Sequence, residues 1–135
     1  MAWNVNASNE EIGVLMEAAV IYRDSQKFTE AREVLEGVRA LLPKSDAVQV
    51  ALGVVCFQQG DFAAAARHYH LALELNPQSA YAYAHLGELD LFQKDKPKAV
   101  EHLKQAVKLD PQGTSGKLAR SLLQFADVIK YKEMA

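Results

Sequence analysis

The chain has 135 residues, of which 50% are apolar and 24% charged, a composition typical of one folded domain and not of a disordered tail. Its 15 Lys and Arg residues nearly balance 17 Asp and Glu residues, and no run of like charges is long enough to indicate a nucleic-acid or membrane surface. No window of about 18 residues is apolar enough to span a bilayer, and the amino terminus lacks the features of a secretory signal. We therefore expect a cytoplasmic protein with no nucleic-acid partner and no membrane insertion.

The first two predicted elements are helices over residues 12–24 and 29–41. Ser8 and Glu11 have the spacing of a capping box ahead of the first helix. Pro43 ends the second helix, because proline lacks a backbone donor and clashes with the preceding turn. Trp3 lies before these helices in a polar tail, where folding back onto the helices, remaining loose and contacting a partner all stay open.

The next four predicted helices form two further pairs, 46–59 with 63–75 and 80–93 with 97–109. Between the first pair, Gly60 suits the left-handed position that ends a helix, and Asp61 suits the cap of the next one. Between the second pair, Pro97 suits a first helical turn. Each pair is therefore predicted to be a helical hairpin.

The hairpins follow a period of 34 residues, which separates Pro43, Pro77 and Pro111. The same period aligns three alanines that lie twelve residues before the prolines, Ala31, Ala65 and Ala99. It also aligns the small residues Ala19, Gly53 and Gly87, and the large residues Leu35, Tyr69 and Leu103. A fixed period of this length is typical of stacked helical repeats. The small residues allow the two helix backbones of a hairpin to approach closely.

A seventh helix is predicted at about 115–130. One of its faces carries Leu118, Leu122, Phe125 and Ile129, while charged and polar residues lie off that face. A stack of hairpins has two open ends whose apolar faces need covering, so this helix is predicted to be a cap.

These residues together resemble the tetratricopeptide repeat, a resemblance that covers residues 12 to 111. The best matching positions are Tyr83, Leu86, Gly87, Ala99, Leu103, Ala106 and Pro111 in the third repeat, with Leu52, Gly53, Ala65, Tyr69, Ala72 and Pro77 in the second. The resemblance implies an all-α, right-handed superhelix, with repeats at about 12–45, 46–79 and 80–113 in a single domain spanning 1–135. Gln49 and Asp90 depart from the pattern, because aromatic residues are usual at both places.

Little in the sequence indicates catalysis. The four histidines, His68, His70, His85 and His102, lack the spacing of a metal site, and no phosphate-binding loop, HExxH, GxSxG or CxxC motif is present. We expect no enzyme activity, no metal and no cofactor.

An excess of apolar residues is the most informative feature for function. The helix at 46–59 is apolar nearly all round, so it must be covered on most sides. In a superhelix of hairpins the first helices line the concave face, where an apolar groove is predicted from Met16, Val20, Val50, Val54, Phe57, Tyr81, Leu91 and Phe92. The groove lacks the basic residues that some relatives use to clamp a C-terminal carboxylate.

Two hypotheses follow for this groove. It binds a segment of a partner protein, extended or helical, or its side chains only complete a crowded core or a self-association surface. The size, the architecture and stretches such as QKFTEAREVLEGV resemble the bacterial type III secretion chaperones built from this repeat. The alternative from another class is a self-assembling structural scaffold or adaptor, and a homodimer also stays open.

Overall fold

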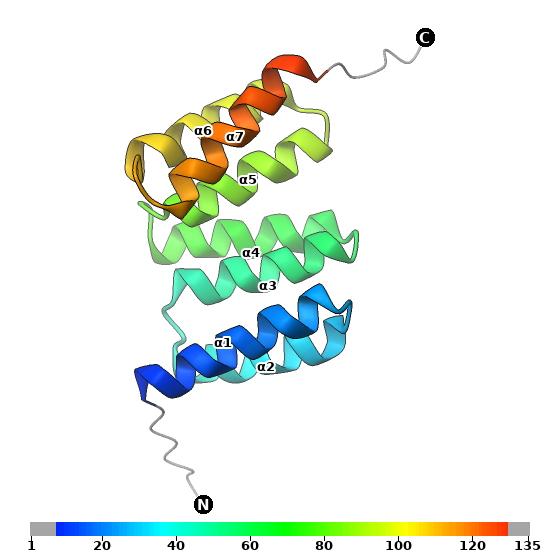
Figure 1. The fold of residues 1–135 in the computed structure, drawn as a ribbon, viewed down its shortest axis with the longest axis vertical. Coiled ribbons are helices and arrows are strands. Elements are labelled where there is room, and N and C mark those ends of the chain that lie inside the picture. The colour runs from blue at the N-terminus through cyan, green and yellow to red at the C-terminus, as the bar shows by residue number, and fades with distance from the viewer. Residues whose placement is uncertain (1–7, 130–135) are drawn as a thin grey trace, which may run out of the picture.

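Residues 8–129 are described by the computed structural model, which folds them into seven helices stacked along one axis (Figure 1). The helices are α1 (Asn9–Asp24), α2 (Phe28–Leu41), α3 (Asp46–Gln58), α4 (Phe62–Leu75), α5 (Ala80–Phe92), α6 (Lys96–Leu109) and α7 (Thr114–Val128). All seven begin and end within three residues of their predicted limits, and the described residues contain no strand. Trp3 lies outside the described residues.

Short polar side chains cap five of the seven described helices, and in the second and third repeats they stand at the same point of the period. The hydroxyls of Ser8, Ser45 and Ser79 accept the backbone N–H three residues on, which caps α1, α3 and α5. Asp61 and Asp95 do the same for α4 and α6, at 3.1 and 3.2 Å. At the predicted capping box the Glu11 N–H donates to the Ser8 hydroxyl at 3.2 Å, and the Glu11 carboxylate accepts from that hydroxyl at 3.1 Å in place of the Ser8 backbone N–H.

The turn inside each hairpin needs a residue with left-handed backbone conformation. Gly60 has φ of 82°, as predicted for the end of α3. Gln26 and Lys94, one period before and after it, adopt φ of 61° and 63° although they carry side chains. The three hairpins therefore turn in the same way, and only the second has the residue that favours this turn.

The hairpins close around small residues, as predicted. A Cβ atom placed on Gly53 would lie 2.4 Å from Tyr69 Cε1, and one placed on Gly87 would lie 2.5 Å from Leu103 Cδ2. Tyr69 and Leu103 are fully buried, so neither can move aside freely. Glycine is thus the residue that permits the α3–α4 and α5–α6 crossings.

The core runs along the stack as three neighbouring clusters. The first joins α1, α2 and α3, the second joins α3, α4 and α5, and the third joins α5, α6 and α7. Leu86 is buried, at 2% exposure, in the second cluster, so it packs between the second and third hairpins. In the third cluster Ala119 and Ala126 of α7 are fully buried, which confirms that α7 covers the last hairpin.

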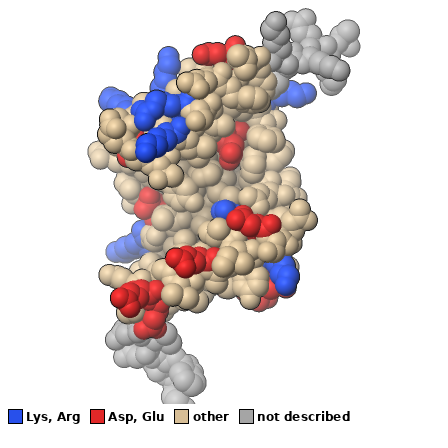
Figure 2. Space-filling model, in the orientation of Figure 1, with Lys and Arg blue, Asp and Glu red and all other residues tan. Residues whose placement is uncertain are grey.

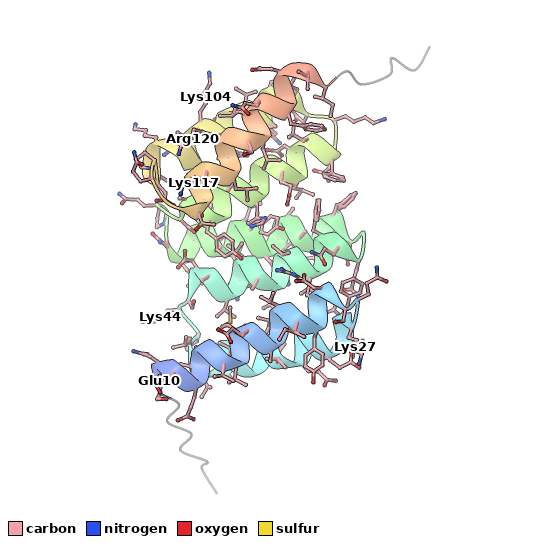
Figure 3. All side chains as sticks on the ribbon, in the orientation of Figure 1. Glu10, Lys27, Lys44, Lys104, Lys117 and Arg120 are labelled. Carbon is pink, nitrogen blue, oxygen red and sulfur yellow. The ribbon has the colours of Figure 1, made fainter. Side chains whose placement is uncertain are left out.

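Charge is unevenly distributed between the two ends of the stack. Figure 2 shows a group of blue side chains near the α7 end and several red ones near the α1 end, with fewer charges of both signs elsewhere on this face. The labels of Figure 3 identify Lys104, Lys117 and Arg120 at the α7 end, and Glu10 together with Lys27 at the α1–α2 end.

Candidate functional site

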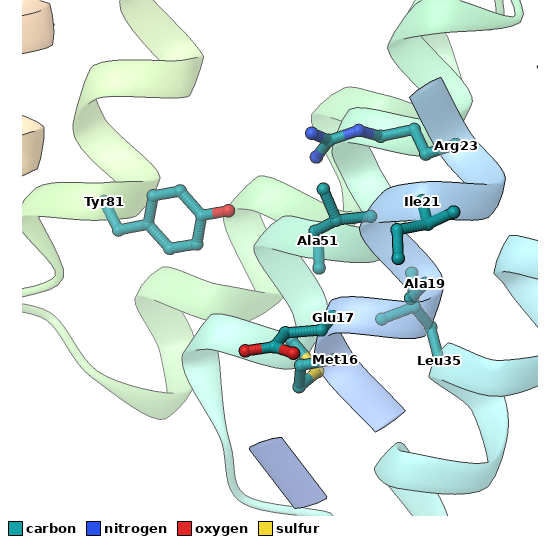
Figure 4. A pocket seen from close by; sticks show the side chains of 9 residues that line it. Met16, Glu17, Ala19, Ile21, Arg23, Leu35, Ala51 and Tyr81 are labelled. Atoms are coloured by element: carbon teal, nitrogen blue, oxygen red, sulfur yellow. The ribbon is translucent and has the colours of Figure 1, made fainter. Parts of the chain in front are cut away.

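A pocket of about 420 Å³ opens between the first helices of the three hairpins (Figure 4). Most of its lining comes from α1, with single residues from α2, α3 and α5; the set is Met16, Glu17, Ala19, Val20, Ile21, Arg23, Leu35, Ala51 and Tyr81. The aliphatic groups form its floor and the three polar side chains lie at its rim. We call it the first pocket.

Three of the predicted groove residues meet in the first pocket, namely Met16, Val20 and Tyr81. Val20 is 41% exposed, and Met16 and Tyr81 are half-buried. Tyr81 belongs to the third hairpin and the other two to the first, so the stacking of the repeats brings them together.

The polar rim combines a phenol, a cation and a carboxylate. Figure 4 shows the Tyr81 side chain pointing from α5 toward α1, with Arg23 and Glu17 on opposite sides of the pocket. Burial raises the pKa of Tyr81 above its ordinary value, with a smaller opposing effect from Arg23, so the hydroxyl stays protonated and can donate a hydrogen bond. Arg23 pairs with the exposed Asp24 at 3.2 Å.

Behind this rim, Tyr81 belongs to an aromatic cluster with His85 and Tyr69. The Tyr81 and His85 rings meet edge to face at 4.9 Å, and His85 stacks on Tyr69 at 5.9 Å. His85 Nδ1 lies 3.3 Å from the Glu88 carboxylate. These contacts hold Tyr81 in place beside the pocket.

A smaller pocket of about 190 Å³ lies between α5 and α7. Its lining is Glu88, Leu91, Phe92, Leu122, Phe125 and Ile129, and we call it the second pocket. The predicted groove residues Leu91 and Phe92 therefore do lie together, but they face α7 and not the first pocket. Phe92 is 61% exposed, whereas Leu91 is buried at 4% exposure.

Phe57, a half-buried candidate of α3, contacts the Phe92 side chain of the second pocket. Its ring lies 4.8 Å from the Phe92 ring in an edge-to-face contact and 5.4 Å from the Phe62 ring. Phe57 is half-buried in this contact, so most of its apolar surface already has a partner. Phe92 is the aromatic residue of this group that offers most surface to a ligand.

Val50 and Val54 do not line an accessible groove, and on this point the prediction needs correction. Val50 is fully buried and Val54 is 6% exposed, and both pack in the second core cluster with Tyr69, Ala82 and Leu86. The reason is that α3 is the central first helix, with a hairpin on each side. Its surplus apolar side is covered by α5, so the surplus reflects a helix buried on most faces.

The sequence analysis did not assign the α7 wall of the second pocket to the candidate site. Leu122, Phe125 and Ile129 were assigned only to the cap, yet they also form one wall of the second pocket. Phe125 is 51% exposed, more than a side chain that only covers the last hairpin needs to be. This exposure indicates a pocket, and it cannot be read from the sequence pattern.

Gln49 and Asp90, which depart from the repeat pattern, each pair with a histidine of the following helix. His68 Nδ1 lies 2.9 Å from Gln49 Oε1, and His102 Nδ1 lies 2.6 Å from Asp90 Oδ2. Both polar partners are buried, so the histidines satisfy their hydrogen bonds. His68 and His102 are 34 residues apart, and this period could have revealed their shared structural role.

The chemistry of the site is suited to recognition. Within residues 8–129, no three His, Cys, Asp or Glu side chains gather as a metal site would require. None of the described helices has the length and apolarity needed to cross a bilayer. The pockets instead combine apolar floors with a few rim groups that can hydrogen-bond, which is the usual arrangement of a ligand-binding cleft.

Comparison with known proteins identifies the repeat. Two family models, both described as tetratricopeptide repeat, match residues 16–80 and 56–124, and the second alone spans more than half of the chain. The chain belongs to the tetratricopeptide repeat family. None of the curated proteins matches it significantly.

Solved structures of tetratricopeptide repeat proteins share the fold. The first such domain of Spaghetti (RPAP3), bound to an HSP90 peptide, has a TM-score of 0.70 at 19% identity, covering 92% of this chain and 96% of that one. The Yersinia enterocolitica type III secretion chaperone SycD, in complex with a peptide of the translocator YopD, has a TM-score of 0.70 at 18% identity, covering 90% and 95%. The TPR2B domain of yeast Sti1, in a complex with pHsp70, has a TM-score of 0.73 at 17% identity, covering 86% and 95%.

Proposed function

We propose that this single domain of three repeats and a capping helix is a non-catalytic module that binds a segment of another protein on the face formed by its first helices. The observation that carries the proposal is the first pocket, which draws its lining from all three hairpins and keeps an open apolar floor. Leaving such surface in water costs about 25 cal/mol per Å². An apolar side chain of a partner would recover part of this free energy.

The rim of the pocket favours a polypeptide as the ligand. The Tyr81 hydroxyl can donate to a carbonyl group, and the exposed Glu17 carboxylate can accept from an amide. An extended segment offers both main-chain groups next to its side chains, and an amphipathic helix offers apolar side chains at regular spacing. Peptide complexes of RPAP3 and SycD, which share the fold, also support a polypeptide ligand.

A finer proposal is that the chain acts in the cytoplasm as a chaperone for type III secretion substrates. The match to SycD over most of both chains supports it. In this case the bound segment would come from a protein awaiting export, and the apolar pockets would shield its own apolar residues.

Site-specific cross-linking would test the location of the binding face. The photoreactive residue benzoylphenylalanine would replace Val20 beside the first pocket, Phe92 beside the second, or Lys104 on the exposed side of α6. Each variant would be illuminated in cells that produce the natural partners, and cross-linked proteins would be identified by mass spectrometry.

The proposal expects the same partner segment to be captured from Val20 and Phe92 but not from Lys104. Capture from Lys104 alone would place the binding site on the second helices and would contradict the proposal. A partner recognised as an export substrate would support the chaperone role, whereas any other partner would remove it while leaving the binding face intact.

A further inference from the structure

The outer side of α1 carries an exposed stripe that alternates acidic and apolar residues. Glu10, Val14, Glu17 and Ile21 follow one another at spacings of four, three and four residues, so they share one side of the helix. All four are exposed, and Val14 and Ile21 each keep 65% of their surface in solvent. No helix precedes α1 within the described residues, so this stripe, which we call the acidic end, has no neighbour there.

The outer side of α7 carries a stripe with the same spacing. It consists of Lys117, Ser121, Gln124 and Val128, all exposed, with Val128 at 72% exposure and the exposed Arg120 beside it. No described helix follows α7. We call this stripe, with Arg120, the basic end.

The two ends differ in charge as well as in place. Residues 9–41, which form α1 and α2, contain seven acidic and four basic residues, a net charge of −3. Residues 96–129, which form α6 and α7, contain six basic and three acidic residues, a net charge of +3. Within the described residues Glu10, Glu17 and Lys117 take part in no ion pair, so these charges are available to a partner.

The direction of the helices also fits. Figure 1 shows α1 and α7 both starting at the left of the view and running to the right, at opposite ends of the long axis. A second copy stacked along that axis would therefore bring its α1 beside this α7 in the same direction. If the first turns of the two helices are aligned, Glu10 would lie opposite Lys117, and Ile21 opposite Val128.

We propose that a second copy of this chain is the partner of these ends, with the acidic end of one copy packing on the basic end of the next. Such a head-to-tail contact joins two different surfaces, so each added copy leaves one of each kind free. The result is an open stack that grows with concentration. Glu17 and Ile21 also line the first pocket, so a stacked copy would cover part of it, whereas no residue of either stripe lines the second pocket. Self-association is measured on the chain alone, so its test does not depend on peptide binding.

The contact is small, and this determines how it should behave. One helix face against another buries less than the roughly 1,200 Å² of a stable interface. Exposed ion pairs weaken when salt shortens the Debye length from about 30 Å at 10 mM to about 3 Å at 1 M. The association should therefore be weak and lost at high salt.

Sedimentation equilibrium of the 135-residue chain would measure it, from about 10 μM to about 1 mM protein. At about 10 mM salt the weight-average mass should rise steadily above the monomer value of 14.9 kDa, and at about 1 M salt it should return to that value. A mass that stays at 14.9 kDa in all conditions would overturn the proposal, as would a dimer mass that no longer grows with concentration.

Charge reversal distinguishes this contact from general stickiness. Glu10→Lys with Glu17→Lys makes both ends basic, and Lys117→Glu with Arg120→Glu makes both ends acidic. Each double variant alone should associate at least tenfold more weakly than wild type, and an equimolar mixture should regain association because opposite ends meet again.

A control carries the same change in net charge as Glu10→Lys with Glu17→Lys, at positions outside both stripes. Glu74→Lys with Glu101→Lys alters exposed positions on α4 and α6 and should keep the association of wild type. If this control weakens association as much as the end variants do, or if the mixture fails to associate, the proposed contact is wrong. Circular dichroism would establish that every variant keeps its helices.

Discussion

Gly53 of α3 lies directly against the ring of Tyr69 of α4. A Cβ atom on Gly53 would be 2.4 Å from Tyr69 Cε1 and 3.2 Å from the Ala65 carbonyl oxygen. Tyr69 is fully buried, and burial raises the pKa of its hydroxyl above the ordinary value. The second hairpin therefore depends on the absence of a side chain at one position.

Gly53→Ala should destabilise the protein by about 1–3 kcal/mol, because the added methyl group forces the ring or the backbone out of place. Gly37→Ala is the matched control, since nothing lies within 4 Å of a Cβ atom there. In the middle of α2 the same substitution should stabilise by about 0.5–1 kcal/mol. Urea unfolding would measure both, and two shifts of the same sign would contradict the close contact.

A second prediction concerns the start of α2. Lys27 occupies the position that Asp61 and Asp95 occupy in the next two periods, and its φ and ψ of −90° and 71° are close to those of Asp61, −88° and 78°. The Lys27 side chain makes no capping bond. Lys27→Asp should therefore stabilise the fold by about 0.5–2 kcal/mol. Thermal unfolding would show it, with Lys27→Ala as the variant that removes the lysine without adding a cap.

A third prediction concerns the core between the second and third hairpins. Leu86→Ala should cost about 2–5 kcal/mol, because it removes buried methyl groups and leaves a cavity beside Val50 and Val54. Lys104→Ala, at an exposed position of α6, should stay within about 0.5 kcal/mol of wild type. Equal shifts in the urea midpoint at equal slopes would contradict the assignment of buried and exposed sides.

A fourth prediction concerns pH. Burial lowers the pKa of His68 below its ordinary value of 6.5; Glu36 opposes this shift, and Arg67, Arg32 and Arg39 add smaller contributions in the same direction as burial. Above pH 6.5 the ring is neutral in both the folded and the unfolded chain. As the pH falls below this value the unfolded chain takes up the proton first, so the free energy of unfolding should decrease until the folded-state pKa is passed.

Replacing His68 should reduce this loss of stability. The test compares urea unfolding of wild type and His68→Gln at pH 7.5 and pH 5.5, values about one unit above and below the ordinary pKa. His70→Gln, at an exposed position of the same helix, is the control for the substitution itself. An identical decrease in wild type and His68→Gln would show that His68 is not responsible.

The helices and their pairing were predictable because each boundary has a local cause. Pro43 and Pro77 end helices, and Gly60 fixes a turn, through backbone properties that no distant residue alters. The 34-residue period then repeats the hairpin three times. The existence of α7 was readable for the same reason, but its buried side includes Ala119 and Ala126, whereas Phe125 of the predicted face is 51% exposed.

The candidate site was less predictable because it depends on how hairpins pack against each other. Val50 and Val20 look alike in the sequence, yet Val50 is fully buried and Val20 is 41% exposed. The difference arises because α3 has hairpins on both sides, whereas α1 begins the described stack. Position within the stack, and not the pattern inside one repeat, decides which apolar residues can meet a partner.

The most direct test of the proposed function is calorimetry of the cross-linked partner segment with folded variants of this chain. Phe92 is 61% exposed, so Phe92→Ala should bind at least about thirtyfold more weakly, a loss of about 2 kcal/mol, with little change in stability. Lys104→Ala should bind like wild type. If Phe92→Ala and Val20→Ala both retain wild-type affinity, the first-helix face is not the binding site and the central proposal is wrong.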